Sequence, residues 1–192
     1  MMGRIATLAA FLAAATLLQG CFPAAVVATG AAVSIATDRR TTGIYIEDEN
    51  IELKTLGVLR DKRFEAAHVN ATSYNRRVLL TGEAPSEELR KQVEASIRTI
   101  ASVRDVQNEI QVAGASSLAS RGNDALITSN VKARMLNNKV FNATQVKVVT
   151  EAGVVYLMGL VTRAEGDEAV FVTRNTSGVS RVVPLFEYIA AS

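Results

Sequence analysis

The chain has 192 residues and a formal net charge of +2, with 21 Lys and Arg against 19 Asp and Glu. A protein that covers nucleic acid needs a dominant basic surface, so this balance argues against nucleic acid as a partner. The length suits one domain of ordinary size or two small ones, and the single Cys excludes an internal disulfide.

The first 20 residues have the organisation of an export signal. Arg4 precedes the apolar run IATLAAFLAAATLLQG, and this order of a cation, an apolar stretch and small residues is typical of secretory signals. The run has about 16 residues, whereas a helix that crosses the hydrocarbon layer needs roughly 20. Residues 1–20 are therefore predicted to be a signal peptide rather than a membrane span.

The only cysteine closes this run, in the order Leu18-Gln19-Gly20-Cys21. A small residue followed by Cys resembles the lipobox of bacterial lipoproteins. The resemblance implies a diacylglyceryl thioether on Cys21, cleavage before it and acylation of the new amino terminus, which together make attachment effectively permanent. Because Phe22 replaces the Asp that retains such proteins at the inner membrane, the expected location is the periplasmic face of the outer membrane. The alternative is an ordinary signal peptide in which the Cys is accidental.

Residues 21–46 are predicted to form a lipidated tether ahead of the folded part of the chain. The stretch FPAAVVATGAAVSIAT, residues 22–37, is rich in Ala and Val and carries no charge. It is too short for a second membrane span. It either lies on the bilayer or acts as a tether, and the tether is favoured.

The remainder of the chain contains an internal repeat, with one copy over residues 47–112 and the other over residues 123–192. The aligned pairs include Ile51 with Ile127, Leu59 with Met135, and Gly82 with Gly159. The intervening stretch AGASSLASRG, residues 113–122, is small and polar, as a linker is.

Each copy is predicted to begin with a helix and a β-hairpin, and the second copy shows the pattern more clearly. Ile127, Val131 and Met135 recur every four residues and make one apolar stripe on a helix. The segment VKVVT, a turn at Gly153 and the segment VVYLMG then have the alternation of a hairpin. In the first copy Asn75 occupies the turn.

A second helix and a last strand complete each copy. In the first copy Pro85-Ser86 opens a helix, and in the second Thr162 with Glu165 predicts a capping box. The last strands are VRDVQNEIQV and SRVVPLFEYI. Pro184 lacks an N–H group, so the second of these strands should lie at a sheet edge or a bulge.

The repeated order of helix, strand, strand, helix, strand predicts an α+β fold with a three-stranded mixed sheet packed against two helices, since a helical crossover lets the third strand run parallel to a neighbour. The pattern ITSNVKARML…VKVVTEAGVVYLMGLV…GVSRV resembles the BON domain. A lipobox followed by two such copies resembles the dual-BON outer-membrane lipoproteins of the DolP type. Two tandem BON domains are therefore expected.

The side chains that catalysis or metal binding requires are scarce. His68 is the only histidine, and lipid attachment would use Cys21, so neither a Cys/His dyad nor a convincing Ser/His/Asp set remains. Clustered His and Cys ligands and glycine-rich phosphate loops are also missing from the sequence. We expect no catalytic residues, no metal site, and no cofactor besides the covalent lipid on Cys21.

Gly82 and Gly159 occupy equivalent strand ends, where the BON resemblance places a hallmark glycine. A close helix contact or a backbone angle that only Gly tolerates explains this without a ligand, so both residues are assigned a structural role.

Binding is the class of function that remains. The resemblance implies that the second domain recognises an anionic phospholipid, such as phosphatidylglycerol, through its first helix at about residues 124–138, and that the protein supports envelope integrity. Leu126 stands where DolP-type sequences often have an aromatic residue. The expected lipid contacts are Leu126, Ile127, Asn130, Lys132, Arg134 and Lys139.

Two alternatives accompany this hypothesis. The helix is either an ordinary amphipathic one with solvated cations, or part of a periplasmic adaptor that binds envelope proteins and touches lipid incidentally. The charges favour the second copy as the lipid-binding one, because residues 48–112 carry ten Lys and Arg against eleven Asp and Glu, whereas residues 121–192 carry eight against six.

Overall fold

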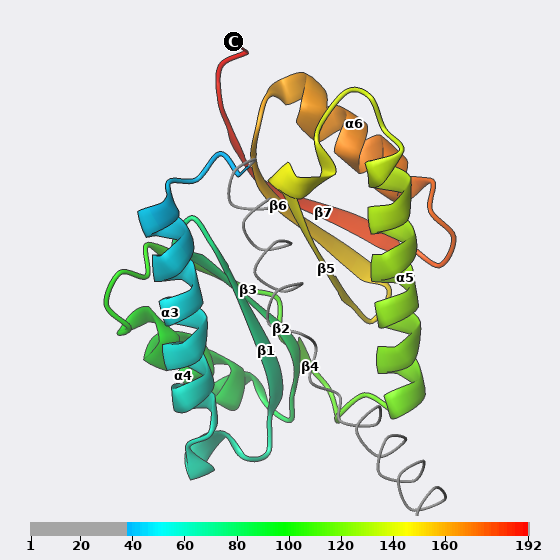
Figure 1. The fold of residues 1–192 in the computed structure, drawn as a ribbon. Helices are drawn as coiled ribbons and strands as arrows, with labels where there is room; N and C mark the ends of the chain where they lie inside the picture. Colours follow the sequence, from blue (N-terminus) through cyan, green and yellow to red (C-terminus); the bar gives the residue numbers. More distant parts are fainter. Residues whose placement is uncertain (1–37, 192) are drawn as a thin grey trace, which may run out of the picture. The chain divides into compact units, whose positions relative to one another are not determined.

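The computed structural model describes residues 38–191. The predicted signal peptide, Cys21 and most of the predicted tether lie outside the described residues. The elements follow the predicted order in both copies (Figure 1). The α+β class and the two tandem domains are confirmed.

The first domain contains two α-helices, a 3-10 turn and four strands. In chain order they are α3 (Thr42–Leu59), η1 (Lys62–Phe64), β1 (His68–Tyr74), β2 (Arg77–Ala84), α4 (Glu87–Arg98), β3 (Asp105–Asn108) and β4 (Gln111–Val112). The second domain repeats the order with α5 (Leu118–Leu136), η2 (Ala143–Gln145), β5 (Val146–Glu151), β6 (Val154–Val161), α6 (Arg163–Arg174) and β7 (Arg181–Tyr188).

Both first helices begin earlier than the sequence pattern suggested. The Thr41 side chain accepts a hydrogen bond from the amide of Ile44 and starts α3 inside the predicted tether. The Ser117 side chain accepts from the amide of Ser120 and starts α5 inside the predicted linker. Polar capping side chains thus extend helices beyond their apolar stripes, and the segment between the domains is shorter than residues 113–122.

The sheets have the predicted mixed topology. In each domain a two-residue turn joins an antiparallel hairpin, β1–β2 or β5–β6, and the last strand pairs in parallel with the second. The first sheet differs from the prediction because its last strand is split into β3 and β4, so it has four strands. Pro184 lies on β7, an edge strand, as its missing N–H group requires.

Two helices cover one face of each sheet and enclose a core (Figure 1). In the second domain the stripe of Ile127, Val131 and Met135 packs against Leu157 of β6 and Phe186 of β7. The predicted capping box of α6 is present, with Thr162 and Glu165 bonding each other's backbone groups. The first core is built in the same way, from Ile51, Val78, Leu80, Val93 and Ile97, among others.

An aspartate on each first helix binds the turn of its own hairpin. The Asp124 carboxylate accepts hydrogen bonds from the amides of Ala152 and Gly153 at 2.9 and 2.8 Å. Asp48 accepts from the amides of Asn75 and Arg76, both at 2.7 Å. All four turn residues have positive φ angles. The buried carboxylates satisfy amides that such tight turns leave unpaired, and they fix each helix to its sheet.

The faces of the sheets that are turned away from the helices also pack together. Tyr74 and Leu79 of the first domain form one buried cluster with Tyr156 and Met158 of the second. Partly buried residues border this cluster, namely Val149, Val154, Leu160, Val183 and Leu185. Burial raises the pKa of the Tyr156 hydroxyl to about 12, and the nearby Glu109 carboxylate adds to this effect. Both faces of the central strands β2 and β6 are therefore buried.

Ion pairs join the two domains around this cluster. Arg39 donates to the two carboxylate oxygens of Glu165 at 2.6 and 2.8 Å. Lys147 contacts Glu52 at 2.8 Å, and Arg104 contacts Glu187 at 2.6 Å. Each pair joins a residue on the first-domain side to a residue of the second domain. These contacts therefore fix the packing of one sheet on the other.

Gly82 and Gly159 lie where the backbone leaves no room for a side chain. Gly82 has a φ of 107°, and a β-carbon there would lie 2.1 Å from the carbonyl oxygen of His68. A β-carbon on Gly159 would lie 2.6 Å from the carbonyl oxygen of Gln145. Both obstacles are main-chain atoms, which supports the structural role assigned to these glycines.

Replacement of Gly159 tests this role. We expect Gly159→Val to destabilise the protein by at least about 2 kcal/mol, because the main chain must move to admit the side chain. Gly122→Ala is the matched control, since nothing lies within 4 Å of a β-carbon there. That change should stabilise the helix by about 0.5–1 kcal/mol. Urea unfolding followed by circular dichroism measures both, and a Gly159→Val protein of native stability would contradict the assignment.

The Arg39–Glu165 pair gives a prediction about pH. The hydrogen bonds from Arg39 hold the pKa of Glu165 at about 2, below its ordinary 4.5. A lowered folded-state pKa stabilises the fold above the unfolded-state value, and this contribution is lost as the pH falls through the folded-state value. Arg39→Met should therefore lower the thermal midpoint by about 2–4 °C at pH 7. The difference from the wild type should shrink between pH 4.5 and pH 2, and a constant difference would contradict the prediction.

Candidate membrane-binding site

Helix α5 is held on its sheet by one side of its surface. Asp124, Ile127, Val131 and Met135 are buried, and they recur at the spacing that places them on one face of a helix. Thr128, beside this face, also reaches the sheet through a hydrogen bond to Thr150 of β5 at 2.7 Å, and the opposite side of the helix is presented to the surroundings.

The outward side of α5 is an uncharged ridge. Successive residues on a helix are about 100° apart, so the residues opposite the buried face follow from the spacing. Within residues 122–137 all of them are exposed and none carries a charge, and they are Gly122, Leu126, Ser129, Asn130, Ala133, Leu136 and Asn137. Two large apolar side chains, Leu126 at 65% exposure and Leu136 at 72%, stand on this ridge. We refer to these seven residues as the α5 ridge.

Cations flank the α5 ridge on both sides. Lys132 and Arg134 are exposed and about 200° apart around the helix axis, so one lies on each side of the ridge. Arg134 donates a hydrogen bond to the carbonyl oxygen of Asn175 at 2.5 Å, which holds its guanidinium on the α6 side. Lys139 follows the end of the helix and is also exposed.

No negative charge opposes these cations on α5. Asp124 is the single acidic residue between Leu118 and Leu136, and it is buried against the hairpin turn. The exposed surface of the helix is therefore either neutral or positive.

The structure exposes five of the six predicted lipid contacts, two of them on the α5 ridge and three beside or beyond it, and buries the sixth. Leu126, Asn130, Lys132, Arg134 and Lys139 are exposed. Ile127 is 2% exposed and belongs to the hydrophobic core. The prediction that Ile127 contacts lipid is wrong for this conformation, because its side chain points at the sheet.

Three exposed apolar residues near the site were missed by the sequence reasoning. They are Leu136 on the α5 ridge, Val140 in the following loop and Phe171 on α6. Phe171 is 63% exposed on a helix that covers the same sheet face as α5, and Asn138 joins the two helices by a hydrogen bond to Glu168 at 2.7 Å. The helical spacing of the buried stripe is enough to predict from the sequence that Leu136 is exposed on the ridge. Phe171 lies on α6, and only the tertiary fold places α6 beside α5.

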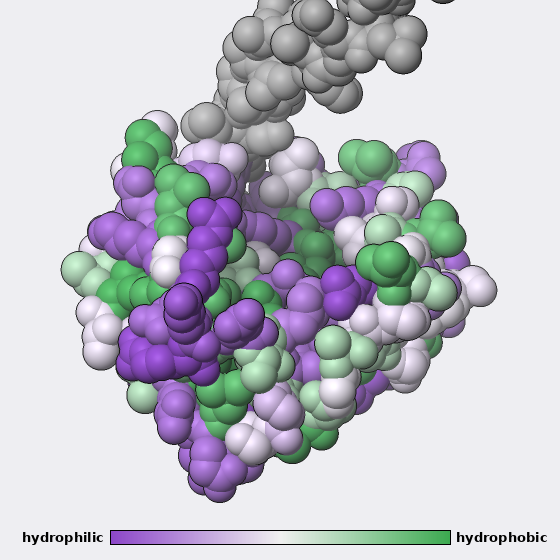
Figure 2. Space-filling model, turned by 90° about the horizontal axis from the view of Figure 1, so that it is seen from below, coloured by the Kyte–Doolittle hydropathy of each residue, from purple (hydrophilic) through white to green (hydrophobic). Residues whose placement is uncertain are grey.

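Helix α3 occupies the equivalent position in the first domain but has a different surface. Glu47, Glu49 and Glu52 lie along it, and Lys54 is the one cation within the helix. Seen from below, hydrophilic side chains crowd the part of the molecule that contains α3 and α4, whereas hydrophobic and intermediate ones are interspersed over the part that contains α5 (Figure 2). The two first helices therefore present different surfaces.

Other site chemistry was sought across residues 38–191. In this range no group of three or more His, Cys, Asp or Glu side chains is arranged to hold a metal ion. His68 faces Glu83 at 3.2 Å across the β1–β2 hairpin. None of the helices described combines the length and apolar character that crossing a bilayer requires.

Comparison with known proteins identifies the repeat. The family model for the BON domain matches residues 47–114 and again residues 123–190. The chain belongs to the BON-domain family. The two matches coincide with the two folded copies, so the BON resemblance of the sequence pattern is confirmed.

Two relatives resemble the chain over most of its length. "Outer membrane lipoprotein DolP" of Haemophilus influenzae is 37% identical over 184 residues, which cover 95% of each chain. The "21 kDa hemolysin" of Actinobacillus pleuropneumoniae is 32% identical over 154 residues and 79% of each chain. The likeness to the first confirms a dual-BON protein of the DolP type and its predicted location as a lipid-anchored protein of the outer membrane. Neither relative is named as an enzyme.

The neighbours Leu126 and Ile127 give a test of the two sides of α5. Leu126→Asp should shift the thermal midpoint by no more than a few degrees, because the new carboxylate remains in water. Ile127→Asp should unfold the second domain, because it places an unpaired charge in the core. Circular dichroism melting of residues 38–192 measures both, and equal midpoints for the two variants would contradict the orientation of the helix.

Proposed function

We propose that this protein is a lipid-anchored module of the periplasmic face of the outer membrane, and that its second BON domain binds anionic phospholipid through the α5 ridge and its flanking cations. The observation that carries the proposal is the surface of α5. It combines exposed leucines with cations on both flanks, and its one acidic residue is buried.

The arrangement suits a helix that lies in the plane of a membrane surface. Leu126 and Leu136 project along the ridge, and burial of a whole Leu side chain contributes about 1.5–3 kcal/mol. Each cation near an anionic surface contributes about 1 kcal/mol. The long, flexible side chain of Lys132 allows its ammonium group to reach a plane that touches the ridge, and Arg134 can reach the same plane once its guanidinium leaves the Asn175 carbonyl. Phe171 provides a second apolar contact beside α5.

The covalent anchor makes modest affinity sufficient. We assign the anchor to Cys21, which lies outside the described residues. A tethered domain meets the membrane at high effective concentration, so even weak head-group binding is populated. The anchor then decides which membrane the protein occupies, and the α5 ridge decides which lipids surround it. Enrichment at anionic lipid such as phosphatidylglycerol is the means by which we expect the protein to support envelope integrity.

Vesicle binding tests the proposal. Residues 38–192, which lie within one compact unit, should co-sediment with phosphatidylglycerol vesicles at low salt, bind less as salt rises, and not bind neutral phosphatidylcholine vesicles. Lys132→Glu combined with Arg134→Glu should weaken binding at least tenfold, about 1.4 kcal/mol. The physical reason is that repulsion replaces attraction at both flanks of the ridge.

The matched control places the same charge change elsewhere. Lys54→Glu combined with Lys91→Glu alters two exposed cations of the first domain and should leave vesicle binding within twofold of the wild type. Equal losses in the two double variants would show that net charge alone determines binding and would overturn the α5 site. Absence of binding at low salt would favour the protein adaptor instead.

A further inference from the structure

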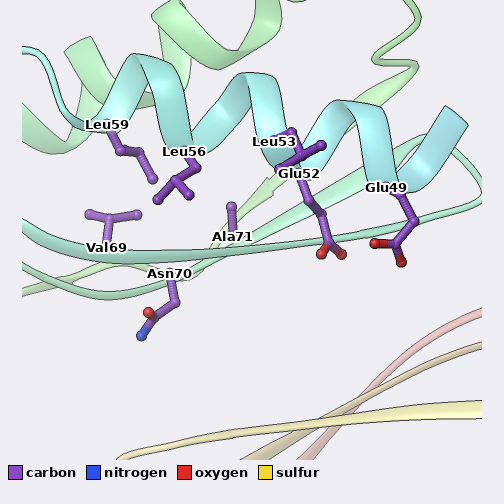
Figure 3. A pocket seen from close by; sticks show the side chains of 8 residues that line it. All are labelled: Glu49, Glu52, Leu53, Leu56, Leu59, Val69, Asn70 and Ala71. Atoms are coloured by element: carbon purple, nitrogen blue, oxygen red, sulfur yellow. The ribbon is translucent and has the colours of Figure 1, made fainter. Parts of the chain in front are cut away.

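The first domain contains a hollow of about 290 Å³ between α3 and the outer edge of β1. Leu56 and Leu59 project from the helix toward the strand, and Val69 and Ala71 point back toward the helix (Figure 3). Leu53, which also lines it, is 66% exposed and Leu56 is 46% exposed. The hollow is thus an open apolar trough along a strand edge.

The strand edge beside the trough has unpaired main-chain groups. β1 pairs with β2 on one side only. The Ser73 amide donates to Glu52 at 2.7 Å and its carbonyl accepts from Lys147 at 3.2 Å, so Ser73 faces away from β2. Alternate residues of a strand face the same side, so the main-chain groups of Val69 and Ala71 face the trough. Within residues 38–191 these groups meet no hydrogen-bond partner.

The second domain lacks this apolar wall. With Ile51 aligned on Ile127, Leu53 corresponds to Ser129 and Leu56 to Lys132. An exposed strand edge beside exposed leucines is an aggregation hazard that folded proteins ordinarily cover or charge. The first domain nevertheless has both the exposed strand edge and the exposed leucines. The equivalent positions of the second domain show that this fold accepts polar residues there.

The two ends of the trough carry opposite charges. Glu49 and Glu52 line the end near Ser73, where Glu52 is paired with Lys147. At the other end Arg60 follows Leu59 directly and Lys62 comes two residues later, and the Asp61 between them pairs with Arg63. Glu49 is exposed, and no described residue forms an ion pair with it. A ligand that runs along the trough therefore meets carboxylates first and cations last.

We propose that this trough binds an extended peptide segment of a partner protein, which adds to the first sheet as a strand antiparallel to β1. Main-chain hydrogen bonds to Val69 and Ala71 supply the pairing, and antiparallel pairs are the more stable kind. Alternate apolar side chains of the segment face Leu56 and Leu59. Its amino-terminal end carries a cation that meets Glu49, and its carboxyl-terminal end carries a carboxylate that meets Lys62.

This site is separate from the α5 ridge and does not rest on lipid binding. The experiment uses the full chain in nanodiscs of neutral phosphatidylcholine. The probe is a fluorescent peptide of sequence KTVTVTE with blocked ends, in which the valines and both charged residues share one face, and fluorescence anisotropy reports binding. Replacing Leu53 and Leu56 by the residues of the second domain, as Leu53→Ser plus Leu56→Lys, should weaken binding at least tenfold. Leu118→Lys plus Ile189→Ser, two exposed apolar residues elsewhere, should not change it.

Backbone methylation separates strand pairing from apolar adhesion. Valines that face α3 also direct their amides at β1, so N-methylation of the valines should abolish binding. N-methylation of the threonines, whose amides face solvent, should be tolerated. The charge-reversed peptide ETVTVTK should bind more weakly. Equal affinity of the two methylated peptides would mean that the trough accepts any apolar chain, acyl chains included, and would overturn the proposal, as would failure of KTVTVTE to bind.

Discussion

The packing of one sheet on the other is the constraint on which the rest of the structure depends. Each domain closes a small core between its helices and one face of its sheet, and the opposite face is apolar as well. Tyr74, Leu79, Tyr156 and Met158 leave water only because the two domains meet through these faces. The central strands β2 and β6 are therefore buried on both sides, as their nearly continuous apolar sequences require.

This packing leaves the helices as the outward surfaces of the protein. A two-domain protein whose sheets are sealed against each other can bind other molecules through its helices and its strand edges. The repeat then allows the two copies to differ. The second copy has a neutral ridge flanked by Lys132 and Arg134, whereas the first has Leu53 and Leu56 beside an open strand edge, with acidic residues on the same helix. One fold thus presents two chemically different surfaces, for which we propose a membrane and an extended peptide as the respective ligands.

The candidate site shows how much of a helix surface can be predicted from the spacing of its apolar residues alone. The four-residue recurrence of Ile127, Val131 and Met135 places Leu126 and Asn130 outward and Lys132 and Arg134 on the flanks, as the structure has them. The same recurrence assigns Ile127 to the core, so a lipid contact there was inconsistent with the pattern that defined the helix. Phe171 is separated from α5 by the whole hairpin, and no local period connects them. The trough beside β1 likewise joins α3 to a strand that follows an intervening loop.

The sequence by itself determined the order of the elements and the repeat, because these depend on local spacing, capping side chains and the order of charged and apolar residues. Pro184 at a sheet edge and the capping box of Thr162 and Glu165 are of this kind. Only the tertiary structure decided that Asp48 and Asp124 bind the hairpin turns, that Arg39 reaches Glu165, and that the two sheets bury each other's outer faces. The physical reason is that burial and pairing across long sequence separations depend on which surfaces pack together. The hydrophobic periodicity of a helix or strand predicts which of its faces is buried, but it does not predict the element against which that face packs.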